Sequence, residues 1–476
     1  MSSGGPGTFL RTTVAYCPVC RESELAIMTA REGGVFMERM CPGGPAEPER
    51  VAASREWYDE RTAEPQEAAV EEGRRPIGRG CPHDCGPCQA HTGGLRLPVF
   101  SITNDCNLAC PKCFTYNRPD QKYYKTPEDT RKIVDHILKR AGKVQLINLT
   151  GGEPTMHPRL AEIIAECQRP EIGRITMNTN GIRLSGDREL ARMLKEAGVQ
   201  VVLSLDSLNP ETSARMNGRD VTREKRGALA MLEEMEIPAT LLMVCAKGVN
   251  ETDVAEMCRD FIGKDFVRSI TIQNMTFTGF YGSKFKPRRH ITLDEVEVLL
   301  EGTGAFSRGD FFSHASYHPL CYSIAYYLVS SGKAIPLARI LGKDALREMT
   351  KGRYYMEAGT GSADIMREGI NRIWAESGDD RLVRELRGIM EKMFPRGGAP
   401  AGGAAAGDVD RYFKAVCLHS HMDEDNFDLD RVSRCGDLVP DEDGRMVPAC
   451  SYNLFYRQSD PRFWVESAGK VGESNG

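Results

Sequence analysis

Short apolar runs alternate with amphipathic stretches throughout residues 97–275. Each apolar run has the length of a β-strand, and the stretch after it repeats its apolar positions with helical spacing. Strands are expected at Leu97–Thr103, Val144–Thr150, Arg174–Asn178, Gln200–Leu205, Ala239–Cys245 and Arg268–Asn274. Helices are expected between them at Glu128–Arg140, Pro158–Gln168, Arg188–Ala197, Lys225–Glu236 and Thr252–Ile262. The alternation predicts an α/β fold with a parallel sheet. Six βα units form a partial (β/α)6 barrel rather than a closed barrel of eight.

The sequence on either side of this repeat has a different pattern. Residues 1–50 begin with a polar, loose segment and continue with two short candidate strands, Ile27–Ala30 and Val35–Arg39, which favour a small hairpin-built metal module. Residues 51–96 are expected to form a linker helix and a cysteine-bearing loop. Residues 276–476 are expected to be mostly helical at first and to end in a second cysteine-rich module.

The composition excludes several classes of protein. With 476 residues, 41% of them hydrophobic, the chain has ample material for a buried core. Its net charge of −5 argues against a nucleic-acid binder driven by bulk electrostatics. No apolar run approaches the about 18–20 residues that span a bilayer, and the N-terminal segment lacks the apolar centre of a secretion signal, so a cytoplasmic protein is expected. The Gly- and Ala-rich run 397–407 predicts a flexible, exposed loop.

Sixteen cysteines are the most unusual feature of the composition. The chain is too long for a small secreted disulfide scaffold, and the cysteines occur in short-spaced groups, which favours metal sites. The strongest group is Cys106-Asn-Leu-Ala-Cys110-Pro-Lys-Cys113. Three thiolates at these spacings leave one iron of a [4Fe–4S] cluster open. The group directly follows the strand Leu97–Thr103, so it is expected at the carboxyl edge of the sheet, where parallel α/β folds bind ligands.

Polar groups follow the next strands in the same position. Gly151-Gly152-Glu153-Pro154 comes after the second expected strand; its glycines permit close approach to a ligand, and its glutamate offers an acceptor for an ammonium group. Asn178 and Asn180 lie at the end of the third strand, and Ser204 and Asp206 at the end of the fourth. These side chains suit ribose hydroxyls or a methionine carboxylate, although the same residue types also serve in turns and helix caps.

The cysteine loop and the GGEP loop together resemble the radical S-adenosylmethionine (SAM) superfamily. Its members use a CxxxCxxC loop for the cluster and a GGEP loop for the methionine amino group. The resemblance implies that SAM chelates the open iron, and that its reductive cleavage yields a 5′-deoxyadenosyl radical that abstracts hydrogen. It also implies an electron donor such as a ferredoxin or flavodoxin. Lys112 departs from the pattern, because an aromatic residue often precedes the last cysteine; here Phe114 follows it. The alternative is a structural zinc or iron site.

A second CxxxCxxC triplet is formed by Cys81, Cys85 and Cys88. The Gly- and Arg-rich sequence before it cannot form a core strand, and no GGEP loop follows one βα unit later. We therefore expect an auxiliary cluster here, with a zinc knuckle as the alternative.

Near the N-terminus, Cys17-Pro-Val-Cys20 is a knuckle of the kind found in rubredoxins and zinc ribbons, and Cys41 adds a third thiolate. Gly44 stands where a fourth cysteine is usual, so the site is expected to borrow a ligand from the triplet Cys81–Cys88. Spacing alone does not separate iron from zinc.

The remaining cysteines fall into two sets. Four widely spaced ones suggest another Fe–S cluster, with scattered buried cysteines as the alternative; they are Cys321, Cys417, Cys435 and Cys450. Three others, Cys167, Cys245 and Cys258, lie inside expected helices or strands and are expected to be free. Without those three and the three of the Cys106 triplet, ten cysteines remain for one mononuclear site and two auxiliary clusters, so at least one auxiliary cluster is expected to lack a fourth thiolate.

The order of motifs along nearly the whole chain resembles the tetraether lipid synthase family and its archaeal and bacterial relatives. The order is CPxC, a lone CP, GCPxDCGxC, TxxCNLxCPxCF, HPxC and a final DGRxxPxCxYN. The resemblance implies an enzyme that joins the alkyl termini of two membrane lipids by a carbon–carbon bond, with three [4Fe–4S] clusters and one rubredoxin-like iron. Members of this branch have also been described as pterin-methylating radical SAM enzymes.

Three functions therefore remain open. The first is lipid coupling, with the substrate lifted from the membrane surface and the protein cytoplasmic or peripheral at the inner face. The second is another radical SAM reaction, either pterin methylation or peptide maturation. The third is a non-enzymatic electron-transfer or metal-binding protein. A long apolar channel ending beside Cys106–Cys113 favours the first, and a polar cleft the second. Apolar stretches that can line a channel, or simply form core, are Thr276–Tyr281, Phe311–Tyr317 and Tyr322–Val329.

Overall fold

The computed structural model describes residues 7–44, 46–66, 76–86, 88–117, 122–330, 333–356 and 413–460; between 357 and 412 it describes 367–371 and a few isolated positions. The Gly- and Ala-rich run 397–407 lies outside these residues, so its flexible loop stays a prediction.

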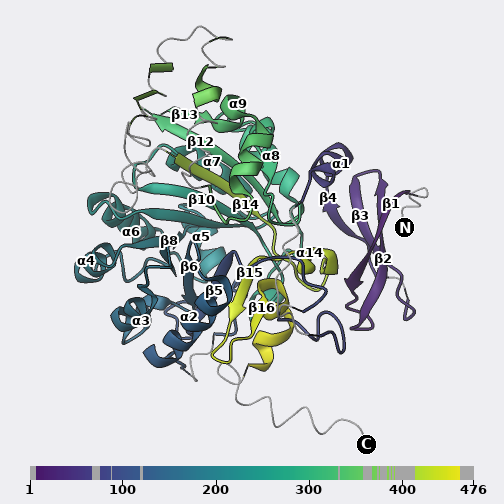
Figure 1. Cartoon of the computed structure of the whole chain (residues 1–476), viewed down its shortest axis with the longest axis horizontal. Helices are drawn as coiled ribbons and strands as arrows, with labels where there is room; N and C mark the ends of the chain where they lie inside the picture. The colour runs from purple at the N-terminus through teal and green to yellow at the C-terminus, as the bar shows by residue number, and fades with distance from the viewer. Residues whose placement is uncertain are drawn as a thin grey trace, which may run out of the picture.

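Six parallel strands form the centre of the molecule, as the sequence pattern predicts. They are β5 (Leu97–Thr103), β6 (Ile147–Gly151), β7 (Ile175–Thr179), β8 (Val199–Ser204), β9 (Ala239–Cys245) and β10 (Val267–Asn274). Each pairs in parallel with the next along the chain. The helices that alternate with them are α2 (Pro127–Ala141), α3 (Leu160–Cys167), α4 (Arg188–Glu196), α5 (Pro210–Asn217), α6 (Thr222–Glu234) and α7 (Glu251–Phe261). Figure 1 shows α2, α3, α4 and α6 along the outer side of the sheet. The α/β fold with a parallel sheet is confirmed.

The C-terminal half extends this sheet at both edges. On one side β14 (Phe413–His419) pairs in parallel with β10, and β12 (Tyr322–Ser330) pairs antiparallel with β14. On the other side β15 (Asp437–Pro440) pairs in parallel with β5. The expectation of mostly helical sequence here is wrong for Tyr322–Ser330, because its aromatic and β-branched residues suit a strand. The remaining strands of this half are β11 (Phe312–Ser313), β13 (Lys333–Pro336) and β16 (Met446–Pro448).

Short helices connect the strands of the C-terminal half. They are α8 (Leu293–Glu301), α9 (Leu337–Leu341), α10 (Lys343–Thr350), α14 (Leu429–Ser433) and α15 (Ala449–Ser451). After α15 the described chain ends in a short π-helical segment, η4 (Tyr452–Tyr456), and a 3-10 turn, η5 (Arg457–Ser459). None of the helices in the described part of the chain is long and apolar enough to cross a membrane.

A separate four-stranded antiparallel sheet lies at the N-terminus (Figure 1). Its strands are β1 (Thr8–Tyr16), β2 (Ser23–Arg31), β3 (Gly34–Arg39) and β4 (Glu49–Ala52). The expectation of a loose segment before Cys17 is wrong, because Thr8–Tyr16 pairs along its whole length with β2. Helix α1 (Arg55–Ala63) joins this sheet to α8, where the buried Arg61 and Glu297 form an ion pair of 3.1 Å.

The two faces of the parallel strands differ in character. Residues facing the helices are buried and apolar, such as Leu149, Leu203 and Leu241. Residues facing the inside of the curved sheet include Asn148 and Gln200, which line a large internal cavity. The alternation follows from the two-residue repeat of a strand. The sheet therefore encloses a lumen with polar groups in its wall.

Candidate functional site

The cysteine loop and the GGEP loop are joined directly to each other. The Gly152 amide donates to Thr103 O at 2.7 Å, and the Glu153 amide donates to Asp105 O at 2.7 Å, just before Cys106. A Cβ atom at Gly152 would lie 2.3 Å from Asp105 O, and one at Gly151, where φ is +140°, would lie 2.1 Å from Thr103 O. Both glycines are therefore required by the close approach of the two loops.

The thiols of Cys106, Cys110 and Cys113 fit a cluster better than a single ion. One tetrahedral zinc with Zn–S bonds of about 2.3 Å holds its sulfurs about 3.8 Å apart. Among the residues that the structure describes, these three sulfurs are not all within 4.8 Å of one another. Burial raises the pKa of Cys110 to about 11, and the nearby Lys112 opposes that rise. The donor set suits a [4Fe–4S] cluster with one open iron.

Glu153 of the GGEP loop is fully buried and hydrogen-bonded through both carboxylate oxygens. Oε1 accepts from the Thr155 amide at 3.1 Å, the Thr155 hydroxyl at 2.7 Å and the Thr179 hydroxyl at 2.7 Å, and Oε2 accepts from the Asn180 amide at 2.6 Å. Each carboxylate oxygen offers about two acceptor positions, so Oε2 keeps one for a further donor. The side chain thus fixes the loop, which continues as η1 (Pro154–Met156), against the end of β7. Its binding to an ammonium group stays a prediction.

The expected contacts at the third and fourth strand ends also lie close together. Lys225, on α6, donates to Asn180 O at 2.6 Å and to Ser204 O at 2.6 Å, and burial lowers the pKa of this lysine to about 8. Asp206 is fully buried and forms an ion pair with Lys112. Lys112, which departs from the usual motif, therefore pairs with the buried carboxylate of Asp206. Sequence reasoning missed Lys225, because a lysine near the start of an amphipathic helix carries no distinguishing signal.

Asn178 lines the lumen, and its side chain does not hydrogen-bond with the cysteine loop or the GGEP loop in the described structure. Its Oδ1 accepts a hydrogen bond of 2.9 Å from Asn148 Nδ2, and the residue lines the internal cavity. Its predicted contact with SAM is not tested by this geometry.

The N-terminal thiols of Cys17, Cys20 and Cys41 come together as expected. Their sulfurs lie within 4.8 Å of one another, which suits one metal ion. No thiol of the second triplet belongs to this group in the described structure, so the expected borrowed ligand is not seen. The contact between the two regions is instead a hydrogen bond of 2.9 Å from Ser23 Oγ to Cys81 O.

The second triplet is enclosed by the end of the described chain. Hydrogen bonding with Cys85 and burial raise the pKa of Cys81, which places these thiols side by side. Arg445 Nε donates to Cys85 O at 2.8 Å, and the Tyr456 hydroxyl donates to Pro82 O at 2.7 Å. These contacts come from the residue just before β16 and from η4, both far away in sequence.

Three of the four late cysteines share a second, small cavity of about 20 Å³. Its wall includes Cys321, Cys435 and Cys450. Cys417 does not belong to this set, because the alternation of β14 places it in the wall of the lumen. His421 Nδ1 lies 3.6 Å from Cys450 Sγ, so a histidine approaches the group where a fourth cysteine was expected.

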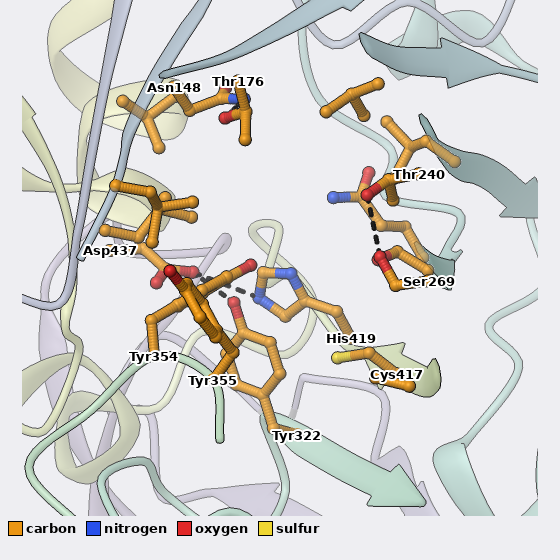
Figure 2. Close-up of a pocket in the computed structure, with 18 of the residues that line it drawn as sticks. Asn148, Thr176, Thr240, Ser269, Tyr322, Tyr354, Tyr355, Cys417, His419 and Asp437 are labelled. Atoms are coloured by element: carbon orange, nitrogen blue, oxygen red, sulfur yellow. Dashed lines mark hydrogen bonds and ion pairs between the residues drawn. The ribbon is translucent and has the colours of Figure 1, made fainter. Parts of the chain in front are cut away.

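The lumen itself has a cavity volume of about 250 Å³. A belt of amides and hydroxyls crosses its wall: Gln200 Nε2 donates to Thr240 Oγ1 at 2.8 Å, and Thr240 Oγ1 lies 2.7 Å from Ser269 Oγ. On the neighbouring strands, Asn148 Nδ2 donates to Thr176 Oγ1 at 2.8 Å. Figure 2 shows Asn148 and Thr176 at the top of the cavity and Thr240 and Ser269 at its right side.

Aromatic residues and a carboxylate form another wall of the lumen (Figure 2). Asp437 is buried and accepts from the hydroxyls of Tyr317 at 2.8 Å and Tyr322 at 2.5 Å, and burial raises its pKa to about 6. Of the apolar stretches expected to line a channel, Tyr322–Val329 contributes Tyr322, Ile324 and Tyr326, whereas Thr276–Tyr281 contributes none of the described lining. The lining is mixed rather than uniformly apolar.

Comparison with known proteins identifies the family. Residues 100–261 match the model of the radical SAM superfamily. The chain is 25% identical to the 7,8-dihydro-6-hydroxymethylpterin dimethyltransferase of Methanocaldococcus jannaschii, over 94% of each chain. It is 34% identical to a probable GTP 3′,8-cyclase of Pyrococcus horikoshii over 34% of this chain, and spans half of that relative. It is 32% identical to a probable GTP 3′,8-cyclase of Thermococcus kodakarensis over 46% of this chain and 72% of the relative. With its cysteine loop and GGEP loop bonded together at the carboxyl edge of a parallel sheet, the chain belongs to the radical SAM superfamily.

Proposed function

We propose that this radical SAM enzyme methylates a flat, polar heterocycle of the pterin class, bound in the barrel lumen. The observation that carries the proposal is the belt of amides and hydroxyls in the lumen wall, which runs from Asn148 through Gln200 to Ser269. The similarity to the pterin dimethyltransferase of M. jannaschii over 94% of both chains supports it.

The belt argues for a substrate with polar edges. An alkyl chain is held by burial of its methylenes, at about 0.8 kcal/mol each, and polar side chains contribute little to that. A pterin carries ring nitrogens, an amino group and a carbonyl, all of which hydrogen-bond with amides and hydroxyls. The tyrosines beside the belt, such as Tyr322 and Tyr354, offer faces against which a flat ring can pack.

Residues of the chain supply binding and orientation for this reaction. Cys106, Cys110 and Cys113 would hold the cluster, and the GGEP loop with the ends of β7 and β8 would hold SAM. One SAM, when bound and cleaved, would supply the 5′-deoxyadenosyl radical that abstracts hydrogen. Because its methyl group leaves with methionine, a second molecule of SAM would supply the transferred methyl group. Phe114 directly follows the last cysteine and lines the lumen, so the substrate would lie next to the radical source.

Auxiliary metal sites are part of the same proposal. The cavity of Cys321, Cys435 and Cys450 and the triplet Cys81–Cys88 would each hold a [4Fe–4S] cluster, and the thiols of Cys17, Cys20 and Cys41 one iron or zinc. An electron donor of the ferredoxin or flavodoxin class would deliver the reducing electron.

Coupling of lipid alkyl chains remains the second candidate. The favouring observation is the apolar part of the lumen wall, with Leu97, Leu146 and Leu242 among its residues. The substrate would then come from the membrane surface, as the resemblance in motif order implies. Peptide maturation has no observation of its own to support it.

The deciding experiment is an anaerobic reaction with reconstituted enzyme, SAM carrying a labelled methyl group and a one-electron reductant. One arm contains a reduced 6-hydroxymethylpterin and another contains extracted lipids. Mass spectrometry is expected to find labelled methyl groups on the pterin. Lipids of doubled chain length that have lost hydrogens, with an unchanged pterin, would replace the proposal by the second candidate.

A further inference from the structure

Two polar side chains from the end of the described chain reach into the lumen. Asn453 lies on η4 and Arg457 begins η5, and both belong to the lining of the cavity. They are deeply buried, with exposed fractions of 8% for Asn453 and 5% for Arg457. Neither residue lies in the βα repeat, so both are brought to the lumen by the folding of the C-terminal segment.

Both side chains carry hydrogen-bonding atoms that the described protein does not satisfy. Asn453 Oδ1 and Arg457 Nε are buried and have no hydrogen-bond partner among the described residues. Buried polar groups are nearly always paired, because the loss of their hydration is costly. One unsatisfied acceptor and one unsatisfied donor, four residues apart and facing the same cavity, indicate a ligand with complementary groups.

The position of Arg457 links this pair to the radical source. Its guanidinium lies 5.5 Å from the ring centroid of Phe114, the residue after Cys113, and 5.0 Å from that of Tyr452. Cys113 is also close enough to act electrostatically on the guanidinium. The pair is therefore at the end of the lumen next to the cysteine loop, where a hydrogen must be abstracted.

We propose that Arg457 and Asn453 form a recognition subsite for a cyclic amide edge of the substrate, with Phe114 packed against the ring. Arg457 donates to the ring carbonyl oxygen, and Asn453 accepts from the adjacent ring N–H. This assignment rests on the proposed function, since a pterin presents these two groups side by side. An alkyl chain presents neither.

Arginine is the discriminating member of the pair. A guanidinium only donates hydrogen bonds, whereas an asparagine amide can turn to offer either its oxygen or its nitrogen. A 2,4-diaminopteridine replaces the carbonyl by an amino group and the ring N–H by a bare nitrogen. Asn453 can adapt to that change, but Arg457 then faces another donor. Selection against the diamino compound should therefore depend on Arg457.

The test compares the binding of 6-hydroxymethylpterin with that of its 2,4-diamino analogue, measured by fluorescence titration of the anaerobic holoenzyme. The wild type is expected to prefer the pterin by about tenfold or more, a ratio typical of one mismatched charged hydrogen bond. Arg457→Gln is expected to lose most of this preference, and Arg457→Lys to keep part of it. The matched control is Arg188→Gln, a charge removal at the exposed ion pair with Glu234, which should leave the preference unchanged.

The outcomes separate the subsite from the proposed function. If the wild type binds both pteridines without preference, or Arg457→Gln keeps the preference, the subsite assignment is wrong and the function stands. If Arg457→Gln instead weakens SAM affinity alone, the pair belongs to SAM and the assignment is also wrong. If the wild type binds neither pteridine, the proposed function fails and the assignment with it. Iron content and circular dichroism of each variant exclude misfolding as the cause.

Discussion

The two CxxxCxxC triplets have the same spacing but are supported in different ways. The Cys106 triplet extends directly from β5, and the GGEP loop holds its first turn through two backbone hydrogen bonds. The Cys81 triplet follows no strand; Arg445 and Tyr456 of the C-terminal segment enclose it. Identical spacing therefore does not distinguish the two metal centres, and the surrounding elements decide whether a small molecule can reach each of them. The first triplet faces the ligand-binding edge of the sheet, and the second is covered by the C-terminal segment.

Removal of single thiols should separate the two triplets most clearly. Cys110→Ala is expected to abolish the formation of 5′-deoxyadenosine from SAM, because the cluster that cleaves SAM loses a ligand. Cys81→Ala is expected to keep some cleavage that is uncoupled from product. Both are measured by chromatography of anaerobic reactions, with solubility and residual iron as controls for folding. Full loss in Cys81→Ala with cleavage kept in Cys110→Ala would reverse the assignment of the two triplets.

Total metal content tests whether the second triplet holds a cluster at all. We expect well over four irons per chain after anaerobic purification, with much of the iron resistant to chelators, because 12 of the 16 cysteines lie in four groups of three. Cys81→Ala should lose a substantial fraction of that iron. About four irons with stoichiometric zinc, measured by elemental analysis, would restrict iron to the Cys106 triplet and make the second a zinc site.

A glycine substitution in each loop should show how tightly each is packed. Gly152→Ala would place a Cβ 2.3 Å from Asp105 O, so SAM affinity is expected to fall about tenfold or more. Gly80→Ala next to the second triplet meets open space at φ +82° and is expected to cost about 1–2 kcal/mol of backbone strain without affecting SAM. Isothermal titration with SAM measures the first effect and thermal unfolding the second. Equal SAM affinity in the two variants would contradict the close approach of the loops.

The smallest expected effect concerns the N-terminal sheet, which lies next to the second triplet. His290 bridges Glu49 of β4 at 2.9 Å and Asp423 at 2.9 Å, and these carboxylates raise its pKa to about 10 despite its burial. A raised pKa stabilises the fold fully below the unfolded value of about 6.5, and this stabilisation is lost as the pH rises towards 10.

The difference in unfolding free energy between wild type and His290→Gln should therefore shrink between pH 6.5 and pH 10. Thermal or denaturant unfolding across this range provides the measurement. The matched control is His136→Gln, because His136 does not bridge two carboxylates in the described structure. A difference that stays constant with pH would show that His290 does not bind its proton through these partners.

Local patterns predicted the barrel well, and long-range pairing was missed. The boundaries expected for β9 match the structure at both ends, because a buried apolar run between turns is a local signal. Thr8–Tyr16 was expected to be loose, since its strand character appears only when it pairs with β2. Tyr322–Ser330 was missed for the same reason, because its partner β14 begins more than 80 residues later in the sequence.

The candidate site divides in the same way. The cysteine loop and GGEP loop were recognisable because their chemistry requires particular residues at fixed short spacings. The division of the late cysteines into two locations could not be predicted from the sequence. Strand alternation places Cys417 in the wall of the lumen, while Cys321, Cys435 and Cys450 line another cavity. No spacing rule describes cysteines that are separated by a hundred residues.

The sequence by itself determined the βα repeat and the two short motifs, since each depends on interactions among residues close together in the chain. Only the tertiary structure decided what the lumen offers a substrate. The inward row of Asn148, Gln200 and Ser269 becomes a belt because the sheet curves, and Arg457 reaches Phe114 because the C-terminal segment folds back over the barrel. Such contacts join residues up to several hundred positions apart, and packing of the whole chain, rather than any local preference, selects them.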